Sequence, residues 1–145
     1  MNNLRMARSY LSQAEERLFH AEMALKRSKY AYCIRQCQET VELSLKGVLR
    51  AVGIEPPKWH DVGPILRREK ERFPEWFKEK IDILSHVSRS LRREREASMY
   101  GDEELMIPPD ELYTEYDARE ALKEAKLVFE ICDRLYRELT DKRIQ

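Results

Sequence analysis

The stretch from residue 28 to residue 61 constrains the fold more than any other part of this chain, because a long helical pattern ends there abruptly. Its apolar side chains fall in one narrow stripe at about 100° per residue. They are Ile34, Cys37, Val41, Leu45, Val48 and Val52. The pattern stops at Gly53, Pro56 and Pro57. A helix with one apolar stripe belongs in a helical bundle.

A second stripe on the same helix is charged and lies about 120° from the apolar one, by the same arithmetic. Its members are Arg35, Glu39, Glu42, Lys46 and Arg50. Such a helix lies at the edge of the bundle, where its charged stripe faces water, a partner or a ligand. The carboxylates of Glu39 and Glu42 share a face and suit an acid–base pair or a metal. Pairing with Arg35 and Lys46, each four residues away, explains them more simply.

The remaining elements follow from periodicity and from the residues that interrupt it. We predict a first helix at residues 3–27, a short helix at 64–72, and a helix that opens at Pro74 and keeps its apolar pattern to Leu91. A long loop at 98–113 precedes a last helix at 115–139, which Thr114 and Asp117 begin as a capping-box variant. The chain is therefore predicted to be a single domain, residues 1–145. Its fold class is all-α: a mainly antiparallel, up-and-down bundle of about five helices, four long and one short.

A heptad pattern marks the first helix. Leucine recurs every seven residues, and alanine recurs at the same interval between the leucines. The positions are Leu4, Leu11, Leu18 and Leu25, with Ala7, Ala14 and Ala21. Two interpretations stay open: packing within one bundle, or a seam between two copies of the chain.

Composition narrows the functional classes. The 27 basic and 27 acidic residues balance, which argues against a general nucleic-acid coat protein but leaves room for a local basic patch. Cys33, Cys37 and Cys132 make no even disulfide framework and are expected to be buried thiols. No apolar run approaches the roughly 20 residues of a membrane span, and the N-terminus has no hydrophobic signal core. We expect a cytoplasmic protein with no membrane association.

Two separated segments carry a resemblance to a known family. The first contains Tyr30-Ala31, Gln36-x-Gln38-Glu39-x-x-Glu42-x-x-x-Lys46-Gly47 and, after a short loop, His60-Asp61. The second contains Tyr100-Gly101-Asp102-Glu103, Ile107-Pro108, Tyr113-Thr114 and Asp117-Ala118, then the Ala-rich helix at 121–125. In this order they resemble HEPN domains, small all-helical modules often encoded beside minimal nucleotidyltransferases. The resemblance covers nearly the whole chain and implies a homodimer.

In HEPN domains that cut RNA, an Arg followed four to six residues later by a His forms a metal-independent ribonuclease site shared across a dimer. The imidazole moves the 2′-hydroxyl proton and the Arg stabilises the charged phosphorane. Here no His follows Arg89, Arg92, Arg93 or Arg95 at that spacing, and Tyr100 stands where Arg95 would require it. The resemblance therefore favours nucleotide or RNA affinity and argues against the usual nuclease activity.

The arginines at 89–95 support two interpretations. Guanidinium groups bind phosphate bidentately, but cations at a helix C-terminus also complement its dipole and pair with nearby carboxylates. Together with the family resemblance, these arginines predict a nucleotide- or RNA-binding site. Its residues are Arg92, Arg93, Arg95, Tyr100, Lys46 and His60. Tyr100 is also the candidate for AMP attachment by a partner nucleotidyltransferase, as related systems imply.

No zinc-ligand spacing and no glycine-rich phosphate loop occurs in the sequence, so we expect no metal and no cofactor. Asp61 is expected to cap the next helix, with His60 near Lys46 as the functional alternative, and His20 is expected at the surface. Three functions remain: a binding module paired with a minimal nucleotidyltransferase in a toxin–antitoxin-like pair, a ribonuclease with a substituted base, and a helical adaptor without a ligand.

Overall fold

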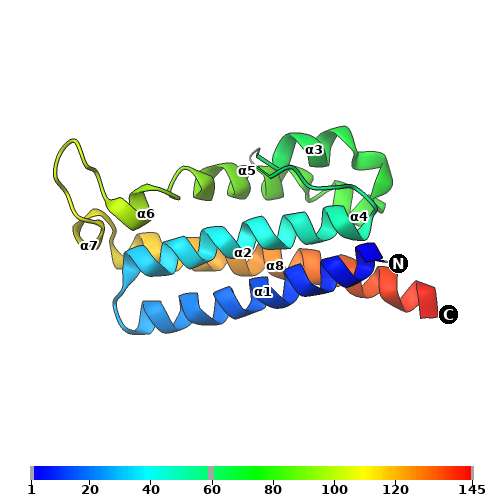
Figure 1. Cartoon of the computed structure of the whole chain (residues 1–145), viewed down its shortest axis with the longest axis horizontal. Helices are drawn as coiled ribbons and strands as arrows, with labels where there is room; N and C mark the ends of the chain where they lie inside the picture. Colours follow the sequence, from blue (N-terminus) through cyan, green and yellow to red (C-terminus); the bar gives the residue numbers. More distant parts are fainter. Residues whose placement is uncertain (1, 59–60, 145) are drawn as a thin grey trace.

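The protein is an up-and-down bundle of four long helices, seen in a computed structural model that describes residues 2–58 and 61–144 (Figure 1). The long helices are α1 (Asn2–Lys26), α2 (Tyr30–Ala51), α5 (Ile81–Arg92) and α8 (Glu115–Ile144). The predicted fold class is confirmed, and no β-strand occurs in the described residues. No helix in this part of the chain is long and apolar enough to cross a membrane.

Helices α1 and α2 form an antiparallel hairpin that closes at a tight turn. The turn is made by Ser28, whose φ of 61° is left-handed, and by Lys29, whose N–H bonds the carbonyl of Ala24 at 2.8 Å. The heptad alanines of α1 are fully buried, and small side chains allow α2 and α8 to approach closely. The first interpretation of the heptad, packing within one bundle, is therefore correct for the alanine positions.

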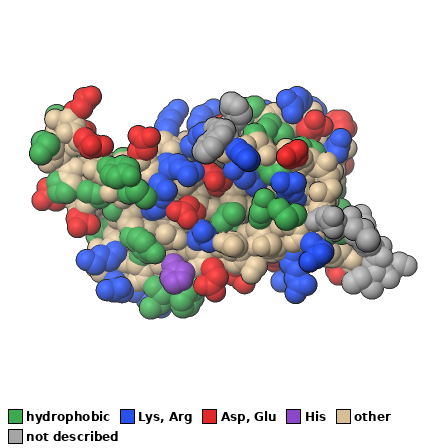
Figure 2. Space-filling model, in the orientation of Figure 1, with side chains coloured by type: hydrophobic (Ala, Val, Ile, Leu, Met, Phe, Trp, Pro, Cys, Tyr) green, Lys and Arg blue, Asp and Glu red, His purple; other side chains and the backbone are tan. Residues whose placement is uncertain are grey.

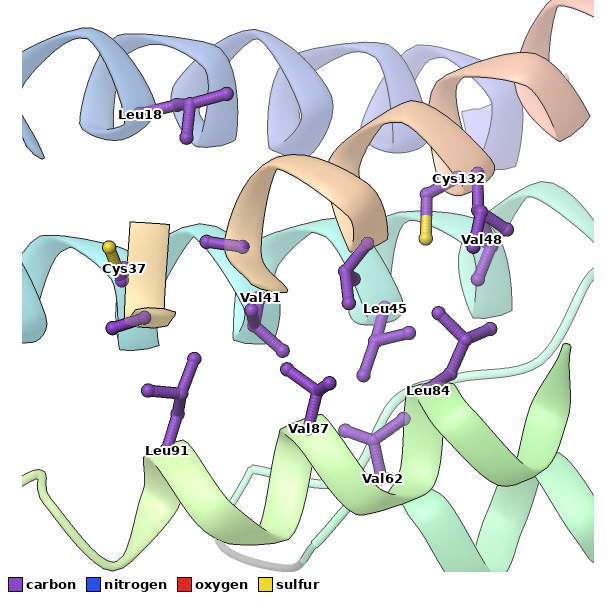
Figure 3. Close-up of a cluster of buried hydrophobic side chains, with 14 of the residues drawn as sticks. Leu18, Cys37, Val41, Leu45, Val48, Val62, Leu84, Val87, Leu91 and Cys132 are labelled. Carbon is purple, nitrogen blue, oxygen red and sulfur yellow. The ribbon is translucent and has the colours of Figure 1, made fainter. Parts of the chain in front are cut away.

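The core lies around α2, where it meets α1, α5 and α8. Figure 3 shows Val41 and Leu45 of α2 facing Leu84 and Val87 of α5, with Val62 beside them. All five are buried, and each large aliphatic side chain buried this way contributes about 1.5–3 kcal/mol. The three cysteines are free thiols within this buried region, as expected.

The fourth predicted helix is interrupted. Between α2 and α5 lie α3 (Gly63–Arg68), a 3-10 turn (Lys70–Arg72) and α4 (Glu75–Lys78). A turn separates α4 from α5, and in it the N–H of Lys80 donates a hydrogen bond to the carbonyl of Phe77. Phe73, Phe77 and Ile81, which lie before, within and after α4, are all buried.

The predicted long loop contains two single-turn helices, α6 (Ala97–Tyr100) and α7 (Pro109–Leu112). Between them the chain forms a narrow loop closed by an isolated bridge between Asp102 and Ile107. The capping box that begins α8 is confirmed. The N–H of Thr114 bonds Asp117 at 2.9 Å, and the N–H of Asp117 bonds the Thr114 hydroxyl at 3.2 Å.

Candidate functional site

The charged stripe of α2 is covered along much of its length, since α1 lies on one side and the segment after α5 on the other. All five of its residues are half-buried, namely Arg35, Glu39, Glu42, Lys46 and Arg50. Charges taken partly out of water need partners, and each of the two carboxylates collects several.

Glu39 joins α1 to α2. One carboxylate oxygen accepts a bond from Arg17 at 2.9 Å, and the other accepts one from Arg35 at 3.0 Å. The Arg35 guanidinium also donates to the backbone carbonyl of Arg95. Glu39 therefore holds Arg35 in position against the chain segment that follows α5.

Glu42 lies at the centre of a larger group of cations. Its oxygen Oε1 accepts a bond from Arg95 at 2.9 Å, and Lys46 lies 3.7 Å from the other oxygen. Lys46 Nζ also lies 3.5 Å from the carbonyl oxygen of Lys58. Arg92 lines the same small hollow as Glu42. Lys46, Arg92 and Arg95 around Glu42 are called the basic cluster below.

Gln38 forms the floor of that hollow, whose other lining residues include Val41, Val62 and Ser88. Its side chain is 3% exposed, and its Nε2 donates to Glu42 at 3.3 Å. A carboxylate only accepts hydrogen bonds, so this contact fixes which end of the amide faces Glu42. The other end, Oε1, has no hydrogen-bond partner among the described residues. It is a buried acceptor beside a group of cations.

Asp61 stands beside the hollow and organises the start of α3. One of its oxygens accepts bonds from the N–H of Gly63 at 3.1 Å and from the Ser88 hydroxyl at 3.0 Å. The prediction that Asp61 is the N-cap is wrong, because Val62 occupies that position and no side chain caps the helix; Asp61 instead accepts the Gly63 N–H from one residue further back. The second bond ties α3 to α5. The predicted site residue His60 lies outside the described residues.

The structure thus brings together Lys46, Arg92 and Arg95, three of the predicted site residues. Arg93 is exposed at the end of α5. Tyr100 lies on α6 with 60% of its surface exposed, and no hydrogen bond or ring contact joins it to the basic cluster among the described residues. His20 is exposed, as expected, and lies 3.5 Å from Glu16.

A groove of about 470 Å³ opens between α5, α7 and α8, and no pattern in the sequence indicates it. Its lining includes Glu94, Asp117, Glu120 and Glu124. Burial raises the pKa of Glu124 above its usual range, and nearby Glu120 adds to the rise while His86 opposes it. Four carboxylates repel phosphate, so this groove is no candidate for an anion site.

Tyr113 lines the same groove and donates a 2.6 Å hydrogen bond to Glu94. Its pKa lies well above the usual tyrosine value, first because of burial and then because of this bond to a carboxylate. Within the described residues, no group of three or more His, Cys, Asp or Glu side chains is placed to hold a metal ion.

The sequence of this chain is similar to a known domain family and to a named protein. The sequence model of the HEPN domain matches residues 7–135. A protein of Methanocaldococcus jannaschii named "Putative toxin MJ1304" is 31% identical over 134 residues, which span 89% of this chain and 87% of that protein.

A solved structure is similar to this one over most of the chain. The crystal structure of TT1696 from Thermus thermophilus matches with a TM-score of 0.67 and 27% identity, over 88% of this chain and 96% of that one. The family match spans most of the bundle, including α2, α5 and the basic cluster between them. The chain therefore belongs to the HEPN domain family.

Proposed function

We propose that this HEPN domain binds the phosphate groups of a nucleotide or RNA at the basic cluster. The observation that carries the proposal is that Lys46 and Arg95 both pair with Glu42 while Arg92 lines the same hollow. Lysine carries three N–H donors and arginine five, more than one carboxylate accepts, so Lys46 and Arg95 keep donors for an anion. Arginine favours phosphate in particular, because its planar fork of donors matches two phosphate oxygens.

Gln38 does not extend the proposed site, because its unpaired Oε1 is buried under a hollow of about 10 Å³. A space of that size holds about one water molecule and admits neither a ribose nor a base. The phosphate contacts of the proposed site therefore belong to the exposed ends of Arg92 and Arg95.

The proposed function does not include efficient RNA cleavage. No imidazole follows the arginines at the family's spacing, and the phenol of Tyr100 is a poor base near neutral pH because an ordinary tyrosine pKa is about 10. Losing a general base costs about 10²–10⁴-fold in rate. A ribonuclease with a substituted base is the second candidate, and a ligand-free adaptor is the third.

A minimal nucleotidyltransferase is the proposed partner, in a toxin–antitoxin-like pair, and the name of the Methanocaldococcus jannaschii relative agrees with a toxin role. Tyr100 is the proposed acceptor of AMP. Its exposure of 60% supports this assignment, because a transferase must reach the hydroxyl. We further propose that the chain forms a homodimer.

Binding to a single-stranded RNA oligonucleotide, measured by fluorescence anisotropy at several salt concentrations, tests the phosphate site. Replacing Arg92 and Arg95 by alanine should weaken binding and reduce the slope of log K against log salt by about 1.4, since each phosphate contact contributes about 0.7 for a single strand. The matched control replaces Arg67 and Arg68, two exposed arginines of α3, and should keep the wild-type slope.

Two results would contradict the proposal. One is the absence of wild-type binding to any nucleotide or RNA at low salt, which favours the adaptor. The other is metal-independent cleavage by the wild type that the Arg92/Arg95 variant abolishes, which favours the ribonuclease. The partner is tested separately: after co-expression with a neighbouring nucleotidyltransferase, intact-mass analysis should find AMP on the wild type and none on Tyr100→Phe.

A further inference from the structure

The loop at residues 102–107 is an ordered display of apolar and acidic side chains. Leu105 is 70% exposed and Met106 is 85% exposed, and Glu103 and Glu104 before them are also exposed. Figure 1 shows the loop extending beyond the end of the bundle, away from the α1–α2 turn. These residues are called the acidic loop. Leu105 and Met106 lie outside the core of their own chain.

The backbone of the acidic loop is held in one conformation. Asp102 and Ile107 exchange two backbone hydrogen bonds, both of 2.9 Å. The N–H of Leu105 bonds the Asp102 carboxylate at 3.1 Å, and Met106 takes a left-handed φ of 58°. A loop that is fixed before binding loses little entropy when it docks, so this rigid apolar display suits recognition of a partner surface.

A surface of the opposite character lies at the same end of the bundle. A pocket of about 380 Å³ opens beside the α1–α2 turn, with Met23, Ala24 and Tyr32 as its apolar part. Its basic part is Arg27, Lys29 and His20, and one carboxylate, Asp110, also lines it. These residues are called the basic pocket. Figure 2 shows Lys and Arg side chains gathered at this end of α1 and acidic and hydrophobic ones on the projecting loop.

We propose that the acidic loop of one copy docks in the basic pocket of a second copy, and that the second copy's loop docks reciprocally in the first. Glu103 and Glu104 then face Arg27 and Lys29, while Leu105 and Met106 cover Met23 and Tyr32. A two-fold axis makes one contact generate the other, because both surfaces belong to every chain. This inference rests on the proposed homodimer and assigns its surface.

Charge exchange tests the pairing in solution. One variant carries Glu103→Lys and Glu104→Lys, and the other carries Arg27→Glu and Lys29→Glu. In each variant alone, both loop–pocket contacts bring like charges together, so sedimentation velocity should show dimerisation weakened at least about tenfold, as expected for like-charge contacts. In an equimolar mixture both contacts are complementary again, and the dimer should return.

A matched control reverses Lys70 and Lys80, two exposed lysines between α3 and α5, and should leave dimerisation unchanged. Leu105→Ser with Met106→Ser tests the apolar half and should weaken dimerisation without rescue in either mixture. Circular dichroism verifies that each variant is folded. RNA binding through Arg92 and Arg95 is measured separately, so failure of the phosphate site does not affect this result.

Any of three outcomes would overturn the proposal. They are a wild type that is monomeric throughout the micromolar range, charge reversals that leave the dimer intact, and a mixture of the two variants that stays monomeric. In the second case the homodimer survives but forms through another surface.

Discussion

Gly101 is the position where a single added methyl group should be most informative. Its φ of 76° and ψ of −159° lie in a region that side-chain-bearing residues avoid. A Cβ there would overlap the carbonyl oxygen of Ile107 and lie 2.9 Å from the nitrogen of Pro109. Gly101→Ala would add this overlap with backbone atoms to a dihedral strain of about 1–3 kcal/mol, so we expect it to open the Asp102–Ile107 bridge.

Opening the bridge loses two backbone hydrogen bonds, each worth about 0.5–1.5 kcal/mol. We therefore expect the free energy of unfolding, measured by urea denaturation, to fall by about 1–3 kcal/mol. Hydrogen exchange tests the opening directly, because an open bridge leaves the amides of Asp102 and Ile107 unprotected while those of α2 stay protected.

Gly53→Ala is the control, since Gly53 also has a positive φ, 84°, but a Cβ there meets nothing closer than 3.7 Å. Only conformational strain remains, about 1–2 kcal/mol, and the hydrogen bonds that end α2 should persist. A Gly101→Ala protein with wild-type stability and wild-type protection of Asp102 and Ile107 would refute the reasoning.

Three further predictions concern the core, the acidic groove and the basic cluster. Leu45→Ala should lower the free energy of unfolding, measured by urea denaturation, by about 2–5 kcal/mol, because Leu45 of α2 is fully buried facing α5. Stability should fall above about pH 10, where an unfolded tyrosine ionises, because folded Tyr113 keeps its proton; Tyr113→Phe should reduce that fall in melts across pH. Glu42→Gln should strengthen RNA binding severalfold in anisotropy, since it removes the carboxylate that competes for Arg95 and Lys46.

Local patterns predicted the elements whose causes are local. The stripe of α2 and the capping box of Thr114 and Asp117 involve residues a few positions apart, and both were predicted correctly. The break between α4 and α5 was not predicted. The apolar pattern continues through both helices, from Phe77 at the end of α4 to Ile81 and Leu84 in α5, so periodicity gives no sign of the turn between them.

The candidate site divides in the same way. The pairs Arg35–Glu39 and Glu42–Lys46 follow from four-residue spacing and are present in the structure. The bond from Arg95 to Glu42 spans 53 residues, and nothing in either local sequence indicates it. Gln38 was noted only as part of the family resemblance. Its role as a buried acceptor depends on Glu42 fixing its amide and on α5 covering it.

The existing ion pairs decide how strongly the basic cluster can bind. Arg95 and Glu42 have side chains 46% and 29% exposed, and a pair this accessible contributes about 0–1 kcal/mol. A phosphate at the same exposed position replaces one charge-assisted hydrogen bond of Arg95 by another, so exchanging Glu42 for phosphate changes the free energy by a small amount. One site alone should therefore bind weakly. In a homodimer two such sites are held together, and an RNA that reaches both gains from effective concentration without any new contact. Self-association and RNA binding would then be measurably coupled.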